Sequence, residues 1–102
     1  MIATRVNQVI RHIHQVLAAD FLVGLKDGQL LERYLEQDDQ RAFAQLVRRH
    51  GPMVLSVGRR VLGNGHDADD VFQASFLVLA RKAASLCQEE SVAGWLFTIA
   101  HR

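Results

Sequence analysis

The sequence predicts an all-α protein, a compact bundle of about four helices preceded by an amphipathic N-terminal helix. Two observations predict this class. Apolar residues recur at intervals of three and four along most of the 102 residues, which is the spacing of one face of an α-helix. The chain also has one proline, seven glycines and no convincing strand pattern, which favours helices over a turn-rich β-sandwich. The length is typical of one domain.

The first two helices are predicted from apolar spacing. Residues 4–21 carry an apolar stripe but too many polar side chains for a signal peptide or a membrane span. Asp27 is a plausible N-cap for a short second helix. The apolar positions of the two helices are Val6, Val9, Ile10, Ile13, Val16, Leu17 and Phe21, and then Leu30, Leu31, Tyr34 and Leu35.

A longer third helix follows, with Asp38 or Asp39 as its cap. Gly51 and Pro52 interrupt the pattern, and because a proline inside a helix costs about 3 kcal/mol we expect a kink or break near His50 unless packing overrides it. A turn is predicted at residues 63–65. The apolar face is Ala42, Phe43, Leu46, Val47, Val54, Val57, Val61 and Leu62.

Two further helices complete the prediction. Asp67 is expected to cap the fourth, which ends near Ala84 and is followed by a polar loop. Ser91 is expected to cap the last helix. The apolar positions are Val71, Phe72, Phe76, Leu79 and Ala80 in the fourth helix, and Val92, Trp95, Leu96 and Ile99 in the last.

Charge is segregated along the chain although its total is only +1. Residues 27–40 carry five acids and one arginine, residues 41–66 carry five arginines and no acid, and residues 67–102 carry five acids and three bases. Such a domain can present faces of opposite charge to different partners, although solvated helix faces are the simpler explanation of the charge pattern. The lone Cys87 excludes an internal disulfide and favours a cytoplasmic location.

The sequence contains no motif typical of a catalytic site or a metal site. The chain lacks a phosphate-binding glycine loop and a nucleophile elbow. His12 and His14 point to different sides of a helix, and the acids at positions 67–70 are explained by helix capping. We therefore expect no enzyme, no cofactor and no metal.

Four ordered motifs carry more information than any single one. They are LLxxY from residue 30, AFxxLVxxxGPxVxxxxRRVLG from 42, DAxDxxQxxFLxxxRK from 67 and WLxxIA from 95. In this order and spacing they resemble region 2 of bacterial sigma factors of the sigma-70 family, extracytoplasmic-function (ECF) type. The resemblance covers residues 27–102, which we expect to form the region 2-like domain, with residues 1–26 as an N-terminal extension.

The resemblance implies that the helix starting at DAxD docks on the clamp helices of the RNA polymerase β′ subunit. Asp70, Gln73 and Leu77 share one face of that helix by their spacing, while Phe72, Leu79 and Ala80 are expected to pack inward. Ala74 stands where the family often has an acid, so some electrostatic contribution to docking is expected to be lost. The implied polymerase contacts are Asp67, Asp70, Gln73, Phe76, Leu77 and Arg81.

The resemblance also implies that the loop at residues 85–91 captures a base of the promoter −10 element and that the last helix follows the non-template strand. Hydrogen-bonding side chains suit base edges and basic ones suit phosphates. Trp95 is more readily explained by core packing than by base stacking. The implied DNA contacts are Lys82, Ser85, Gln88, Ser91, His101 and Arg102, with Arg81 near phosphate; Arg48, Arg49, Arg59 and Arg60 either attract phosphates or are solvated or paired with acids.

The sequence therefore predicts a domain that binds core RNA polymerase and helps to recognise and open the −10 element. The helix-turn-helix domain that reads the −35 element in the family has no counterpart in these 102 residues, so we expect a fragment or a one-domain relative. The alternative is a helical interaction module without DNA binding, which occupies polymerase or an anti-sigma protein as a decoy. Glu89 and Glu90, which oppose phosphate binding, favour that alternative.

Overall fold

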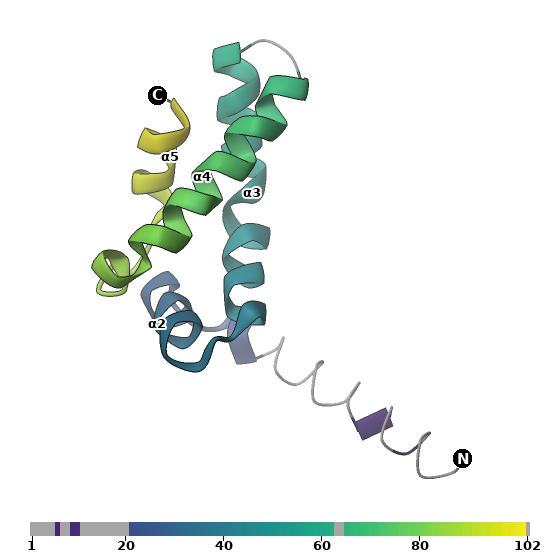
Figure 1. Cartoon of the computed structure of the whole chain (residues 1–102), viewed down its shortest axis with the longest axis vertical. Coiled ribbons are helices and arrows are strands. Elements are labelled where there is room, and N and C mark those ends of the chain that lie inside the picture. Colours follow the sequence, from purple (N-terminus) through teal and green to yellow (C-terminus); the bar gives the residue numbers. More distant parts are fainter. Residues whose placement is uncertain (1–5, 7–8, 11–20, 63–64, 102) are drawn as a thin grey trace.

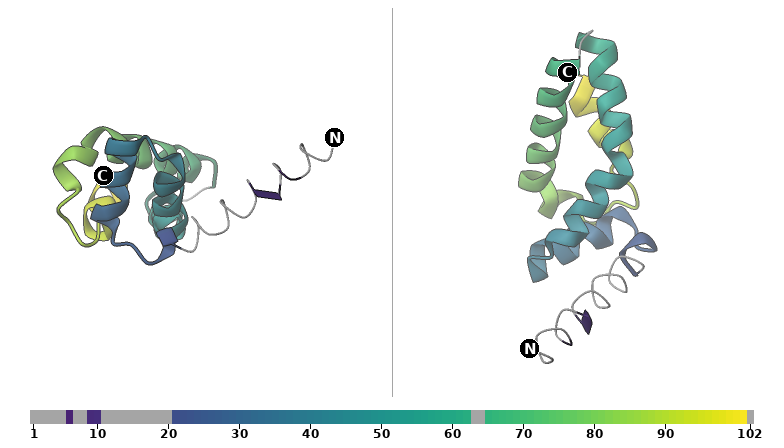
Figure 2. Two further views of the ribbon diagram at one scale, coloured as in Figure 1. Left: turned by 90° about the horizontal axis from the view of Figure 1, so that it is seen from below. Right: turned by 90° about the vertical axis from the view of Figure 1, so that its right-hand side faces the viewer.

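A computed structural model describes residues 6, 9–10, 21–62 and 65–101. It contains the helices α2 (Asp27–Gln37), α3 (Gln40–Leu62), α4 (Gly65–Leu86) and α5 (Ala93–His101), and no strand occurs in these ranges. The long helices α3 and α4 run antiparallel side by side, α5 lies against both, and α2 crosses near the start of α3 (Figures 1 and 2). The all-α prediction is confirmed. Most of the expected N-terminal helix lies outside the described residues.

The core lies where α3 contacts the three other helices. Leucines from all four helices are completely buried there, as the periodic patterns predict. Trp95 is partly buried and packs against this core, as predicted. The fully buried leucines are Leu30, Leu31, Leu46, Leu79 and Leu96.

Helix α3 continues through Gly51 and Pro52, so the chain does not break near His50, while the kink expected there stays a prediction. The missing backbone hydrogen bond at Pro52 is offset by packing, because Val54 and Val57 on the following turn are buried in the core. The glycines allow close packing: a Cβ at Gly51 would lie 3.1 Å from the Phe72 ring, and one at Gly58 would lie 3.2 Å from the Ala68 Cα. The proline is therefore accommodated in a tightly packed helix pair.

Several predicted helix ends shift. The N-cap of α2 is Lys26, whose backbone N–H donates to Gln29 Oε1 at 2.8 Å, so Asp27 is not the cap. Helix α4 begins two residues before Asp67 and ends at Leu86 rather than near Ala84, which places Ser85 inside the helix. The Asp39 cap is confirmed, since its Oδ1 accepts a hydrogen bond from the Arg41 N–H at 3.1 Å.

Two apolar positions predicted to face inward do not. Leu35 is 44% exposed and Val61 is 42% exposed, since both lie near helix ends where less of the helix surface is covered. The predicted turn at Gly63 and Asn64 lies outside the described residues.

Candidate functional site

The outer face of α4 carries the side chains predicted to bind polymerase. Asp70, Gln73 and Arg81 are exposed, and Leu77 is 60% exposed although it is a large aliphatic residue. We call these four residues the α4 face. Leu79, on the opposite side, is completely buried as predicted, whereas Phe72 and Ala80, which were also predicted to pack inward, are only partly buried.

An apolar groove of about 430 Å³ adjoins the α4 face. Phe76 was predicted as a contact residue, but it is only 5% exposed, and its ring packs against Phe72 at 4.9 Å and Phe43 at 6.5 Å between centroids. It forms part of the groove lining and of the core at once. The groove is lined by Tyr34, Gln40, Phe43, Phe72, Gln73, Phe76, Leu77 and Ala80.

The residues predicted to contact DNA divide into two groups. Lys82, Ser85, Gln88 and Ser91 are exposed and gather around the end of α4 and the loop before α5. His101 is exposed at the opposite, C-terminal end of α5, about 13 Å along the helix. The side chains of Asp67 and Arg102 lie outside the described part of the chain.

His101 has an aromatic neighbour that the sequence interpretation missed. The Phe97 ring, 48% exposed, stacks on the His101 ring with centroids 5.7 Å apart and planes 7° from parallel. Their separation of four residues puts both rings on one helix face, and this spacing was the signal that could have found the pair.

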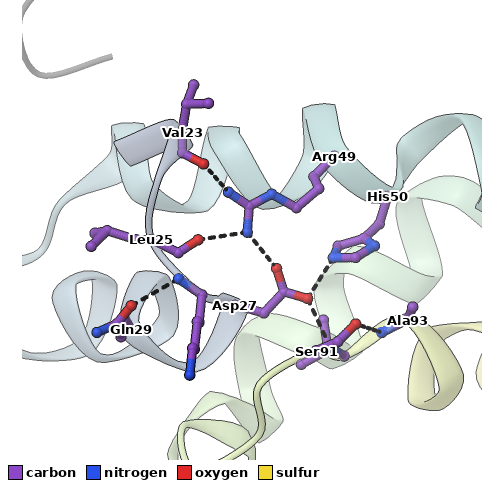
Figure 3. A network of polar contacts seen from close by, with 10 residues as sticks. Val23, Leu25, Asp27, Gln29, Arg49, His50, Ser91 and Ala93 are labelled. Atoms are coloured by element: carbon purple, nitrogen blue, oxygen red, sulfur yellow. Dashed lines mark hydrogen bonds and ion pairs between the residues drawn. The ribbon is translucent and has the colours of Figure 1, made fainter. Parts of the chain in front are cut away.

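A buried carboxylate joins α2, α3 and the loop before α5 (Figure 3). Asp27 Oδ1 accepts a hydrogen bond from Arg49 Nη1 at 2.8 Å, and Oδ2 accepts one from the Val92 N–H at 2.8 Å and contacts His50 Nε2 at 2.7 Å. Arg49 also donates to the carbonyls of Val23 and Leu25. Sequence interpretation missed this cluster, because no local motif signals partners that lie 22, 23 and 65 residues away.

The electrostatics of the cluster favour the ionised acid. Burial by itself raises the pKa of Asp27, but hydrogen bonds from His50, the Val92 N–H and Arg49 outweigh it and lower the pKa from 3.8 to about 2. Since an ionised carboxylate can only accept hydrogen bonds, His50 Nε2 must be the donor. Arg49 is therefore paired with an acid rather than free for phosphate.

Backbone contacts fasten the same loop to the start of α2. The Gly28 N–H donates to the Glu89 carbonyl at 3.0 Å, and the Asp27 N–H donates to the Glu90 carbonyl at 3.2 Å. A Cβ at Gly28 would clash with the carbonyl oxygens of Cys87 and Glu89. We call residues Asp27, Gly28, Arg49, His50 and Val92 the Asp27 junction, and residues 87–92 the 87–92 loop.

Ser91 is not the N-cap of the last helix, because α5 begins at Ala93 and the Val92 carbonyl accepts its first backbone hydrogen bond, from the Leu96 N–H. The Ser91 Oγ accepts a hydrogen bond from the Ala93 N–H at 3.2 Å. Its neighbour Val92 has its N–H bound by Asp27 instead. The N–H groups of Val92, directly before α5, and of Ala93, its first residue, are thus both satisfied, the first from a distant part of the chain and the second locally.

Comparison with known proteins identifies the domain. Residues 46–102 match the protein family described as "Sigma-70 region 2". The chain belongs to this family. The family consists of sigma factors, which are not enzymes, so the match assigns no catalytic reaction to the domain.

Two relatives are RNA polymerase sigma factors, and one of them is of the ECF type. The chain is 34% identical over 73 residues to the ECF RNA polymerase sigma factor SigM of Mycobacterium tuberculosis, which covers 72% of this chain and 37% of the relative. It is 32% identical over 71 residues to the RNA polymerase sigma factor NccH of Alcaligenes xylosoxydans xylosoxydans, with coverage of 70% and 38%. The chain thus spans less than two fifths of the length of these relatives. No solved structure matches the chain.

No three His, Cys, Asp or Glu side chains in the described ranges come together to hold a metal ion. None of the helices described has the length and apolar character that a membrane crossing requires.

Proposed function

We propose that this ECF-like sigma-70 region 2 domain binds core RNA polymerase and takes part in recognising and opening the promoter −10 element. The observation that carries the proposal is the α4 face, a set of exposed side chains beside an apolar groove on the helix that the family uses for docking. A buried apolar contact surrounded by polar groups is the usual composition of a protein–protein hot spot.

The polymerase contact is assigned to the β′ clamp helices. Leu77, 60% exposed, supplies apolar area that gains stability when a partner covers it, and Gln73 beside it can donate and accept hydrogen bonds. Asp70 and Arg81 supply charges at the two ends of the face.

The DNA contact is assigned to the 87–92 loop and to its neighbours on α4. Gln88 and Ser91 can hydrogen-bond the edge of an unstacked base, and Lys82 can meet a phosphate. The stacked rings of Phe97 and His101 add an aromatic surface farther along α5, where a single strand could continue.

A pull-down with the β′ clamp-helix fragment tests the polymerase contact. Leu77→Ala and Gln73→Ala should each reduce retention of the full chain by about tenfold, the effect typical of hot-spot truncation. Leu35→Ala is the matched control, because Leu35 is another exposed leucine but lies on α2 outside the groove lining. Absent binding by the wild type, or equal retention of all four proteins, would contradict the assignment.

A decoy without DNA binding is the second candidate, and the exposed carboxylates of Glu89 and Glu90 in the loop favour it. Fluorescence anisotropy with a labelled single-stranded −10 oligonucleotide, in the presence of polymerase core, separates the two functions. Sequence-dependent binding that weakens with salt supports the sigma-factor function, whereas equal binding of scrambled and −10 strands supports the decoy.

A further inference from the structure

We propose that Asp27 is the positioning residue of the 87–92 loop, which it holds in the conformation that receives the promoter base. The identity of the loop's ligand rests on the proposed function, but the positioning itself can be tested without DNA.

The contacts between α2 and the loop run in both directions. Backbone N–H groups of Asp27 and Gly28, at the start of α2, donate to the carbonyls of Glu90 and Glu89, and the Asp27 carboxylate accepts from the Val92 N–H. N–H groups at helix starts lack partners within their own helix. Here the loop carbonyls accept the hydrogen bonds of the first two N–H groups of α2, and the Asp27 side chain on α2 accepts that of the Val92 N–H directly before α5. Neither element can therefore move without leaving a polar group of the other unpaired.

The carboxylate is the group on which this arrangement depends. Its two oxygens receive three donors, from Arg49, His50 and Val92, and its side chain is only 3% exposed. An asparagine has one acceptor oxygen, and its NH₂ group would face a donor. Asp27→Asn therefore keeps the shape of the side chain but leaves at least one donor without an acceptor.

The arrangement matters for binding because it fixes the backbone of the 87–92 loop, while the side chains proposed to contact the base stay exposed to solvent. Gln88 and Ser91 are exposed on the loop, although the backbone of the residues between and beside them is fastened to α2. A loop held in its binding conformation loses less entropy when a ligand binds. Loosening the Asp27 junction should therefore weaken base capture without touching any group that contacts the base.

The loop contains its own probe, because Cys87 is the single cysteine of the chain and lies in the turn directly after α4. Because the Cys87 side chain is only partly buried, the wild type is labelled by a disulfide reagent at a baseline rate, and an increase of that rate in a variant of the full chain reports loosening of the loop. Asp27→Asn should raise this rate by about tenfold, as expected when a hydrogen bond to a buried charge is lost.

Asp39→Asn is the matched control. Asp39 is also a buried carboxylate, with a side chain 7% exposed and bound to Arg33 at 3.1 Å, but it caps α3 away from the loop. Its substitution should leave the labelling rate within about twofold of the wild type at equal helix content by circular dichroism. Equal acceleration by both variants would show general loosening and overturn the proposal.

His50 provides a second pair of variants if Asp27→Asn fails to fold. His50→Leu removes one donor to the carboxylate, whereas His50→Gln keeps an N–H donor on a side chain of similar length. The leucine variant should accelerate Cys87 labelling and the glutamine variant should restore a rate near that of the wild type. The same rate in both variants would contradict a role through Asp27.

The consequence for DNA is measured with a labelled single strand that the wild-type complex with polymerase core selects from a randomised pool. Asp27→Asn should weaken binding of this strand by about tenfold while retention on polymerase stays unchanged, because the α4 face is intact. If Asp27→Asn and Asp39→Asn bind the strand equally well, the positioning role is wrong. If the wild type selects no strand, the proposed function fails, and the labelling rates alone decide the positioning role.

Discussion

The Asp27 junction and the α4 face use polar groups in opposite ways. In the junction, a carboxylate 3% exposed has each oxygen engaged by donors from the same chain. On the α4 face, the side chains of Gln73 and Leu77 are exposed to solvent. The difference indicates that the junction is organised within the chain itself, whereas the α4 face is exposed, as the proposed polymerase contact requires.

Substitutions in the junction should therefore affect stability, and substitutions on the face should affect affinity. The largest expected effect is that of Asp27→Ala, which removes the acceptor of Arg49, His50 and the Val92 N–H together. Breaking a buried ion pair by removing one partner costs about 3–5 kcal/mol. Urea unfolding measures the loss, and Glu36→Ala, at an exposed acid on the same helix, should stay within about 0.5 kcal/mol of wild type.

A pair of glycine substitutions sharpens the contrast between crowded and open positions. Gly28→Ala places a methyl group against the carbonyls of Cys87 and Glu89 and should destabilise the fold by about 1–3 kcal/mol. Gly94→Ala meets no atom within 4 Å and lies inside α5, so it should stabilise the fold by up to about 1 kcal/mol. Thermal unfolding of both variants decides this, and shifts of the same sign would contradict the close approach at Gly28.

Acid should weaken the junction through Asp27. Its pKa in the folded protein is about 2, below the ordinary 3.8, so its ionised form stabilises the fold above pH 4 and this contribution is lost as the pH falls toward 2. A shift of this size corresponds to about 2 kcal/mol. Urea midpoints at pH 5, 4, 3 and 2 should fall more steeply for the wild type than for Asp27→Asn, and parallel slopes would contradict the assignment.

Regular periodicity predicted most of the fold because each helix buries one face. Leu30, Leu46, Leu79 and Leu96 are all completely buried where the spacing placed them. Local capping was also predictable at Asp39, whose partner is two residues away. At Pro52 the helix continues because tertiary packing outweighs one missing hydrogen bond.

The candidate sites also differ in whether their residues lie on one helix or come from several elements. The α4 face could be predicted, because Asp70, Gln73 and Leu77 lie on one helix and their spacing defines a side of it. The groove could not, because Tyr34 and Phe43 reach it from α2 and α3. Asp27 was taken for a local cap, since nothing in the sequence near it points to Arg49, His50 or Val92.

The smallest effect on stability is expected at Glu90, which combines a backbone contact in the Asp27 junction with an exposed side chain. Its backbone carbonyl accepts the Asp27 N–H inside the junction, whereas its side chain lies on the surface, 81% exposed, with Oε1 3.2 Å from Lys26 Nζ. Glu90→Gln keeps the backbone bond and removes only a solvent-screened pair. The free energy of unfolding should therefore change by less than about 0.5 kcal/mol.

Affinity for the single strand should respond to Glu90→Gln more clearly than stability does. The substitution removes a negative charge from the loop assigned to DNA, so binding should strengthen by about twofold at low salt and by less as salt screens the charge. Gln29→Glu is the control, because it adds an exposed negative charge on α2 and should not strengthen binding of the strand. A large loss of stability in Glu90→Gln would instead mean that the side chain, and not the backbone, holds the loop.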